Sequence, residues 1–183
     1  MTKFRFFGLP LFSLFLFVIP SLVAGQENAR FIDLPPEAAL SVVAYQKECP
    51  VKIEKVDVLF DRKSGNLHFV FYLRNTSKTK DVQSVGLSQW HIGGGGGDLV
   101  PVDLKPVLAA GQSSIIGQPK SGEITQITKS MMEELKLTDT KLTTMLVFLV
   151  NDVRFTDGSR YSNQKLMDNF LQFSNRVELL DTE

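Results

Sequence analysis

The chain has 183 residues, in which 20 Lys or Arg residues are balanced by 20 Asp or Glu residues, so its formal net charge is zero. This balance gives no argument for nucleic-acid binding, which needs a clustered basic face. Cys49 is the single cysteine, which excludes an internal disulfide, so the fold must be stabilised by packing.

The N-terminal residues have the composition of a secretory signal peptide. Two cations precede an apolar run, and small residues follow it: Lys3 and Arg5, then Phe6–Ile19, then Val23, Ala24 and Gly25. This order predicts that residues 1–25 direct export and are removed after Gly25, with a cut after Ala24 nearly as favourable. The protein is then secreted or periplasmic. The alternative is an uncleaved membrane anchor, although the apolar run falls a little short of the roughly 18 residues that span a bilayer.

Residues 26–50 are interpreted as an irregular entry segment that contains one short helix. Pro35-Pro36 precedes the helix, predicted over Glu37–Gln46, because proline is tolerated in the first helical turn. Its apolar residues would form one stripe: Ala39, Leu40, Val43 and Ala44. Pro50 ends the segment.

From Val51 onward the apolar residues alternate with a period of two, which is typical of strands with one face in a core. We expect a first hairpin, whose alternating residues are Val56, Val58 and Phe60, then Leu67, Phe69, Phe71 and Leu73. The turn between them, Asp61–Asn66, contains Gly65 where a positive φ is expected. Val51 and Ile53 are out of phase with Val56, so a bulge is predicted near Glu54-Lys55.

Several shorter elements follow. Strands are predicted at Val82–Trp90, Leu99–Leu104, Val107-Leu108, Ser113–Ile116 and Ile124–Thr128, and a helical turn or two at Lys129–Leu137. Pro101 and Pro106 confine their strands to a sheet edge, because proline donates no ladder hydrogen bond. The five glycines Gly93–Gly97 lose the most backbone entropy on ordering, which predicts a mobile loop tip.

The last elements begin with Thr143–Phe155, the longest apolar run after the leader. Both alternating sets of side chains in this run are apolar, which predicts a central strand that is buried on both faces. Asp157-Gly158 predicts a tight turn into a returning strand at Arg160-Tyr161. Ser162 would cap a final helix, Asn163 to about Phe173, whose apolar stripe docks on the sheet.

Short strands joined by Gly and Asn turns predict a mainly β fold, an antiparallel β-sandwich with short helices at its N- and C-terminal ends. The domain covers residues 51–175, and residues 176–183 form a tail. Phe69–Lys78 resembles the strand and N-x-S-K turn of immunoglobulin-like domains in secreted bacterial proteins. Val153–Ser159 resembles the V-x-F-x-D-G-S hairpin near the end of such domains. The resemblance implies an immunoglobulin-like sandwich that serves as an extracytoplasmic binding or accessory module.

The residue pattern predicts no catalytic, cofactor or metal site. His91 and Asp98 flank the glycine run and could hold a cation, but zinc usually needs three or four protein ligands. No serine or cysteine stands in a nucleophile motif. Cys49 is interpreted as a small buried hydrophobe, because no positive cluster surrounds it to lower its thiol pKa. Asn75-Thr76-Ser77 matches a glycosylation acceptor; because the resemblance implies a bacterial source, we expect this asparagine to stay unmodified.

The residues that we expect to bind a partner are Tyr72, Trp90, His91 and Asp98, with Tyr45 and Tyr161 as further aromatic candidates. Tyr and Trp combine apolar area with a polar tip, and Tyr72 and Trp90 would share one sheet face with Val70. The favoured function is an exported non-catalytic module that binds a protein or a glycan. One alternative is a structural subunit that assembles through an open strand edge at Leu99–Val107. Another is a small hydrolase that uses His91 with Asp98. Membrane contact is expected only through a retained leader.

Overall fold

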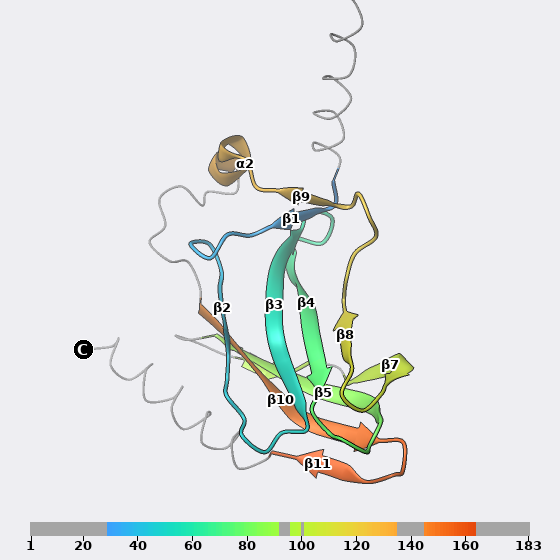
Figure 1. Ribbon diagram of the computed structural model, residues 1–183. Helices are drawn as coiled ribbons and strands as arrows, with labels where there is room; N and C mark the ends of the chain where they lie inside the picture. Colours follow the sequence, from blue (N-terminus) through green and yellow to red (C-terminus); the bar gives the residue numbers. More distant parts are fainter. Residues whose placement is uncertain (1–28, 92–95, 100, 135–144, 164–183) are drawn as a thin grey trace, which may run out of the picture.

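The computed structural model of the protein describes residues 29–91, 96–99, 101–134 and 145–163 (Figure 1). Within these residues the chain forms two β-sheets and one short helix, so the fold is mainly β as predicted. The elements are β1 (Phe31–Asp33), β2 (Leu40–Val43), β3 (Val51–Asp61), β4 (Asn66–Asn75), β5 (Val82–His91), β6 (Gly96–Asp98), β7 (Val102–Leu108), β8 (Ser113–Ile116), β9 (Ile124–Gln126), α2 (Lys129–Glu134), β10 (Met145–Phe155) and β11 (Arg160–Ser162).

Sheet A contains five strands in the order β8-β4-β3-β1-β9. Its centre is the antiparallel β3–β4 hairpin, which pairs Val51 with Asn75 at one end and Asp61 with Asn66 at the other. Gly65 has a φ of 72° in the turn, a conformation that glycine adopts without steric cost. The pairing shifts register between Ile53 and Lys55. The predicted hairpin, its turn and its bulge are therefore confirmed.

Sheet B is built on β10, which pairs antiparallel with β5 along one edge. On the other edge β10 pairs with β2 at its start and with β11 near its end. The far edge of β5 carries β6 and β7. Leu146, Phe148, Leu149 and Val150 of β10 are at most 1% exposed, and they belong to both phases of the strand. The predicted central strand with two buried faces is confirmed.

The core lies between the two sheets, and β10 runs obliquely across β3 and β4 in Figure 1. Phenylalanine rings join the sheets: the Phe148 ring centroid lies 5.1 Å from that of Phe69 and 5.4 Å from that of Phe71. Both ring pairs meet edge to face, an arrangement that aromatic rings prefer. Alternating residues of the two long hairpin strands thus face β10, as the period of two requires.

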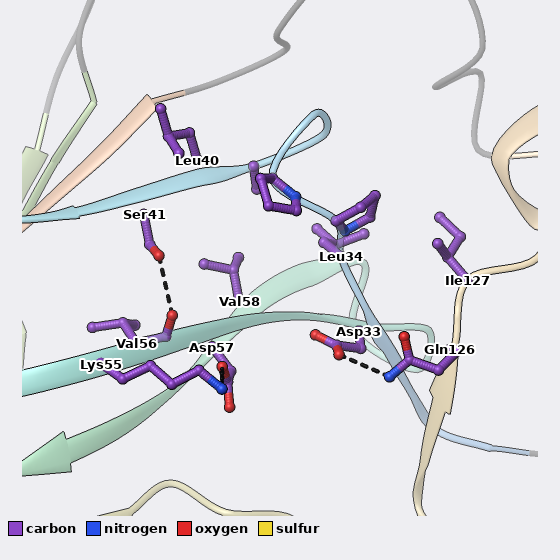
Figure 2. A pocket seen from close by; sticks show the side chains of 13 residues that line it. Asp33, Leu34, Leu40, Ser41, Lys55, Val56, Asp57, Val58, Gln126 and Ile127 are labelled. Atoms are coloured by element: carbon purple, nitrogen blue, oxygen red, sulfur yellow. Dashed lines mark hydrogen bonds and ion pairs between the residues drawn. The ribbon is translucent and has the colours of Figure 1, made fainter.

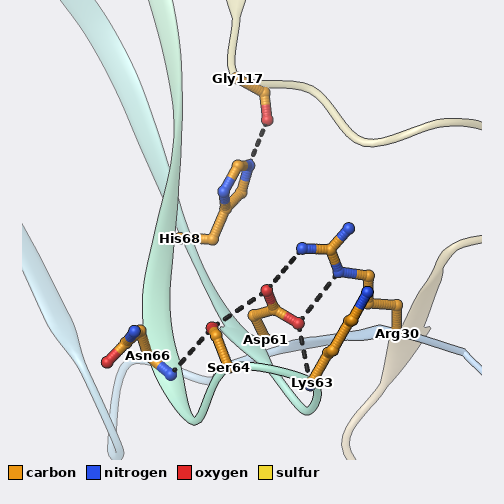
Figure 3. A network of polar contacts seen from close by, with 7 residues as sticks. All are labelled: Arg30, Asp61, Lys63, Ser64, Asn66, His68 and Gly117. Carbon is orange, nitrogen blue, oxygen red and sulfur yellow. Dashed lines mark hydrogen bonds and ion pairs between the residues drawn. The ribbon is translucent and has the colours of Figure 1, made fainter.

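A network of charged and polar groups links the chain at the start of β1 to the β3–β4 turn of sheet A (Figure 3). The Arg30 guanidinium donates to both carboxylate oxygens of Asp61, at 3.0 and 2.7 Å. The same carboxylate accepts hydrogen bonds from the Lys63 amide and the Ser64 hydroxyl in the β3–β4 turn. Nearby, His68 Nε2 lies 2.5 Å from the Gly117 carbonyl oxygen. The network ties the start of β1 to the end of β3.

Two predictions about the early chain and the sheet pairing are wrong. The expected helix over Glu37–Gln46 is a turn followed by strand β2. Its apolar residues fit a helical stripe equally well, but β2 pairs along the buried strand β10 and gains ladder bonds that an isolated helix would lack. The sheets are mixed rather than purely antiparallel, because β1 pairs with β9, and β2 with β10, in parallel.

The later predictions have mixed outcomes. The edge position of β7, the strands β8, β9 and β11, and the helical turn α2 are confirmed. Gly96 and Gly97 belong to strand β6 rather than to a loop tip. The leader at 1–25, most of the final helix predicted after Asn163 and the tail at 176–183 lie outside the described residues. In the described part of the chain, no helix has the length and apolar character needed to cross a membrane.

Candidate functional site

A cleft of about 480 Å³ lies along one edge of β3, and we call it the edge cleft (Figure 2). Its apolar walls come from Leu34, Pro35, Pro36, Ala39, Leu40, Val56, Val58 and Ile127, and its polar groups from Asp33, Ser41, Lys55, Asp57 and Gln126. The four consecutive residues Lys55–Val58 all line it. Successive side chains of a strand point to opposite faces, so a cleft that touches all four must follow the strand edge.

No described strand continues the β1 ladder here, because β1 leaves the edge of β3 early. The β1 ladder ends where Asp33 pairs with Leu59, and the Leu34 amide then donates to the Val58 carbonyl at 3.0 Å. Pro35 and Pro36 follow. They have no amide to donate, so the ladder cannot continue. The chain instead turns into β2, which pairs with β10 of the other sheet.

The next carbonyl on this edge is satisfied by a side chain instead of a strand. The Ser41 hydroxyl donates to the Val56 carbonyl oxygen at 3.1 Å (Figure 2). A hydroxyl can rotate away or accept another partner, so displacement of Ser41 would free this carbonyl for an incoming amide. Among the described residues, the edge cleft thus combines apolar walls with a strand edge where a side chain bonds to the Val56 carbonyl in place of a neighbouring strand.

The mouth of the cleft carries ion pairs and hydrogen bonds. Lys55 Nζ lies 2.7 Å from Asp57 Oδ1, and the Tyr72 hydroxyl donates to Asp57 Oδ2 at 2.9 Å. Gln126 donates to Asp33 at 2.9 Å. The hydrogen bond to Asp57 raises the pKa of both Lys55 and Tyr72 from their ordinary values. Two carboxylates against one ammonium leave the mouth with an excess negative charge.

A second pocket of about 230 Å³ lies further along the same strand. It is lined by Val51–Ile53 of β3 and by Val43–Gln46, which continue from β2. Tyr45 is 78% exposed, and Lys52 Nζ lies 5.9 Å from the centre of its ring. Among the aromatic residues that the sequence suggested for binding, Tyr45 is therefore presented to solvent. The second pocket therefore places Tyr45 beside β3, beyond the residues that line the edge cleft.

The predicted binding residues are distributed over both sheets. Tyr72 lies on β4 in sheet A and supports Asp57 at the mouth of the edge cleft. Trp90 lies on β5 in sheet B and is 7% exposed, packed with Leu149. The expectation that Tyr72 and Trp90 share a sheet face is wrong, because their strands belong to different sheets.

His91 and Asp98 do not form a dyad. Asp98 pairs across the sheet with Ser88, and its carboxylate accepts hydrogen bonds from Ser88 Oγ at 2.5 Å and Asn151 Nδ2 at 2.8 Å. His91 Nε2 lies 2.6 Å from Gln89 Nε2. Because strand residues alternate, Ser88 and His91 project from opposite faces of β5. The described residues contain no group of three or more potential metal ligands.

Cys49 is buried, as the sequence suggested, at 3% exposed. Its thiol donates to the Val51 carbonyl oxygen at 2.9 Å. Burial raises the thiol pKa to about 11, so the group is a neutral thiol at neutral pH. A neutral, buried thiol is a poor nucleophile.

The glycosylation pattern at Asn75 is also buried. Asn75 is 0% exposed, and its amide donates to the carbonyl oxygens of Lys80 and Leu108 at 2.8 and 3.0 Å. Its own oxygen accepts from the Ser77 amide. The folded domain uses this side chain to hold the turn after β4 in place, which gives the asparagine of the N-x-S-K pattern a structural role.

Sequence reasoning missed the edge cleft, because its residues come from four separate strands and from the turn before β2. Pro35-Pro36 is the one local signal, and it marks the end of the β1 ladder instead of the predicted helix start. Comparison of the chain with protein-family models, curated proteins and solved structures finds no match.

Proposed function

We propose that the protein is an exported, non-catalytic binding module that holds an extended segment of a partner protein in the edge cleft. The observation that carries the proposal is the edge of β3 beyond β1, where a serine hydroxyl, and no strand of the described part of the chain, bonds to the Val56 carbonyl and apolar walls border the backbone. Extended peptides bind such edges by adding a strand: main-chain hydrogen bonds supply affinity and side-chain pockets supply specificity.

The cleft also predicts the character of the bound segment. A strand that continues the line of β1 beside β3 would alternate its side chains between the two faces of sheet A. One set would meet the apolar wall formed by Leu40 and Val58. The other would meet the acidic mouth at Asp33 and Asp57. We therefore expect aliphatic residues that alternate with Lys or Arg.

The wider parts of the proposal rest on the sequence. Export rests on the leader at residues 1–25, and the kinship with immunoglobulin-like domains rests on two short motifs and on the presence of two packed sheets. A hydrolase receives less support, because His91 and Asp98 bond to different partners. Assembly through the edge at β7 receives less support, because Pro101 and Pro106 interrupt backbone donation there.

A peptide selection tests the proposed function. Short random peptides are displayed and selected on residues 26–183, and the dissociation constants of enriched peptides are measured by calorimetry. Ile127→Asp places a charge in the cleft wall and should weaken binding at least about tenfold. Ile115→Asp is the matched control, because Ile115 is 44% exposed on β8 at the other side of sheet A.

The proposal predicts that Ile115→Asp changes the dissociation constant less than about twofold. Enriched peptides should alternate aliphatic and basic residues, and their amide resonances should show strand pairing with Val56. Failure to enrich any peptide, or equal weakening by the two variants, would refute binding at the edge cleft.

A further inference from the structure

A separate concave surface lies on the outer face of sheet B, and a β-bulge shapes it. The pairing of β10 with β5 shifts register between Val150 and Asp152, so that Asn151 is the extra residue opposite Gly86 and Leu87. Bulges of this kind re-aim a side chain and are frequent beside functional sites. The Asn151 carbonyl, which the bulge takes out of the β5 ladder, accepts a hydrogen bond from the Asn163 amide at 3.0 Å.

The bulge directs the Asn151 amide toward a fixed carboxylate. Asn151 Nδ2 donates to Ser88 Oγ at 2.9 Å and to Asp98 Oδ1 at 2.8 Å, and Ser88 Oγ donates to the same Asp98 oxygen at 2.5 Å. Ser88 is 0% exposed, so this triangle of polar groups is anchored in the sheet. Asp98 itself is exposed. Its Oδ1 is held by two donors, and its Oδ2 accepts no hydrogen bond within the described part of the chain.

The neighbouring groups complete a pocket of about 310 Å³, which we call the outer pocket. Asp152 lies in its wall with its carboxylate between the guanidinium groups of Arg154 and Arg160. Ser162 adds a hydroxyl, and Leu99 adds an apolar surface. Two carboxylates and two guanidinium groups leave the outer pocket without net charge, although it is rich in both hydrogen-bond acceptors and donors.

We propose that the outer pocket binds a neutral saccharide of one or two sugar units. Each sugar hydroxyl both donates and accepts, so it suits a wall where a carboxylate stands beside guanidinium and hydroxyl groups. An anionic ligand would be opposed by the carboxylates of Asp98 and Asp152 and a cationic ligand by the guanidinium groups of Arg154 and Arg160, whereas a neutral polyol meets neither opposition. The volume lies at the small end of ligand pockets, and Leu99 offers apolar contact to a sugar ring. The site is independent of the edge cleft.

A glycan array tests this inference, with the full exported domain as the probe. The array carries neutral hexoses, N-acetylhexosamines and uronic acids at chain ends, and saturation-transfer NMR repeats the test with the free monosaccharides. Asp98→Asn is the diagnostic variant: its amide oxygen can still accept from Ser88 and Asn151, but Oδ2 is replaced by a donor. We expect binding to neutral sugars to weaken at least about tenfold, because the free acceptor is lost.

Asp103→Asn is the matched control, since Asp103 is exposed on the adjacent strand β7 and lies outside the outer pocket. The Asp103→Asn variant should bind neutral sugars with a dissociation constant within about twofold of that of wild type. Unchanged thermal unfolding of Asp98→Asn would show that the fold is intact. Binding to the terminal sugars of arrayed glycans without binding to free monosaccharides would identify a glycan chain as the ligand. Binding to both would identify the single sugar unit as the ligand. Absence of any neutral sugar binding, exclusive binding of uronic acids, or an unaffected Asp98→Asn variant would overturn the inference.

Discussion

At the scale of single residues, Gly86 shows how one missing side chain permits the polar geometry of the outer pocket. A Cβ atom at this position would lie 2.2 Å from Asn151 Oδ1 and 3.1 Å from Asp152 Cβ. Asn151 Oδ1 is buried and accepts no hydrogen bond from the described residues, so it packs directly against the Gly86 backbone. Asn151 can hold Asp98 in place only because Gly86 leaves this space.

Gly86→Ala should therefore destabilise the domain by about 1–3 kcal/mol, because either the bulge or β5 must shift. Urea unfolding of the purified domain measures the change. Gly97→Ala is the control, since a Cβ there meets nothing within 4 Å, and it should stay within about 0.5 kcal/mol of wild type. Removing Asn151 Oδ1 by Asn151→Ala should lessen the effect of Gly86→Ala in the double variant. Strictly additive free energies would contradict this steric account.

At the scale of elements, the Arg30–Asp61 pair joins the start of β1 to the β3–β4 turn (Figure 3). Hydrogen bonds from Arg30, aided by those from Lys63 and Ser64, hold the pKa of Asp61 well below its ordinary range. A carboxyl whose pKa is lowered by folding stabilises the fold above its unfolded-state pKa, about 3.9. That stabilisation is lost as the pH falls below about 4 toward the lower folded-state value.

Asp61→Asn keeps the shape of the side chain but removes its charge, so it should lower the urea midpoint at neutral pH. The difference from wild type should then narrow as the pH is reduced from about 5 to 2, because wild-type Asp61 becomes protonated over this range. Urea titrations at several pH values measure the trend. Thr79→Ala, an uncharged change at an exposed site, should show no such trend. A difference between Asp61→Asn and wild type that is constant with pH would exclude the charge as its cause.

The elements also show what the sequence could predict. The β3–β4 hairpin, its bulge and strand β10 were predictable because their signals are local: alternation, a glycine turn and a run that is apolar on both phases. Strand β2 was not predictable from the sequence, because its apolar residues also fit one stripe of a helix: Ala39, Leu40, Val43 and Ala44. Whether this segment forms a helix or a strand depends on its pairing with β10, about a hundred residues later in the chain. Tertiary pairing overrides such weak local preferences.

The candidate sites were less predictable than the strands. The edge cleft exists because β1 leaves β3 after Asp33, a consequence of sheet topology that no residue pattern encodes. Asp98 was identified beside the glycine run, but its partners Ser88 and Asn151 come from two other strands. Asn151 was hidden inside an apolar run, where a bulge cannot be recognised without the pairing of the partner strand.

At the scale of the whole molecule, export through the leader should leave the described fold intact. A cut after Gly25 makes Gln26 the first residue, and the first described residue is Ala29, beside the Arg30 that bonds to Asp61. Cys49 is buried and free, so an oxidising compartment finds no exposed thiol among the described residues. With the proposed export, both proposed sites would meet their partners outside the cytoplasm.

We therefore predict that the protein isolated from a bacterial host lacks residues 1–25 and is recovered outside the cytoplasm. Mass spectrometry of the intact product measures the N-terminus, and cell fractionation measures its location. Leu16→Arg interrupts the apolar run that the export machinery recognises, so it should leave an uncleaved product inside the cell. Thr2→Ala is the control, because it changes neither the cations nor the apolar run. An intact Met1 on wild-type protein in the membrane fraction would instead show that the leader is an anchor, and the two sites would then act at the membrane surface.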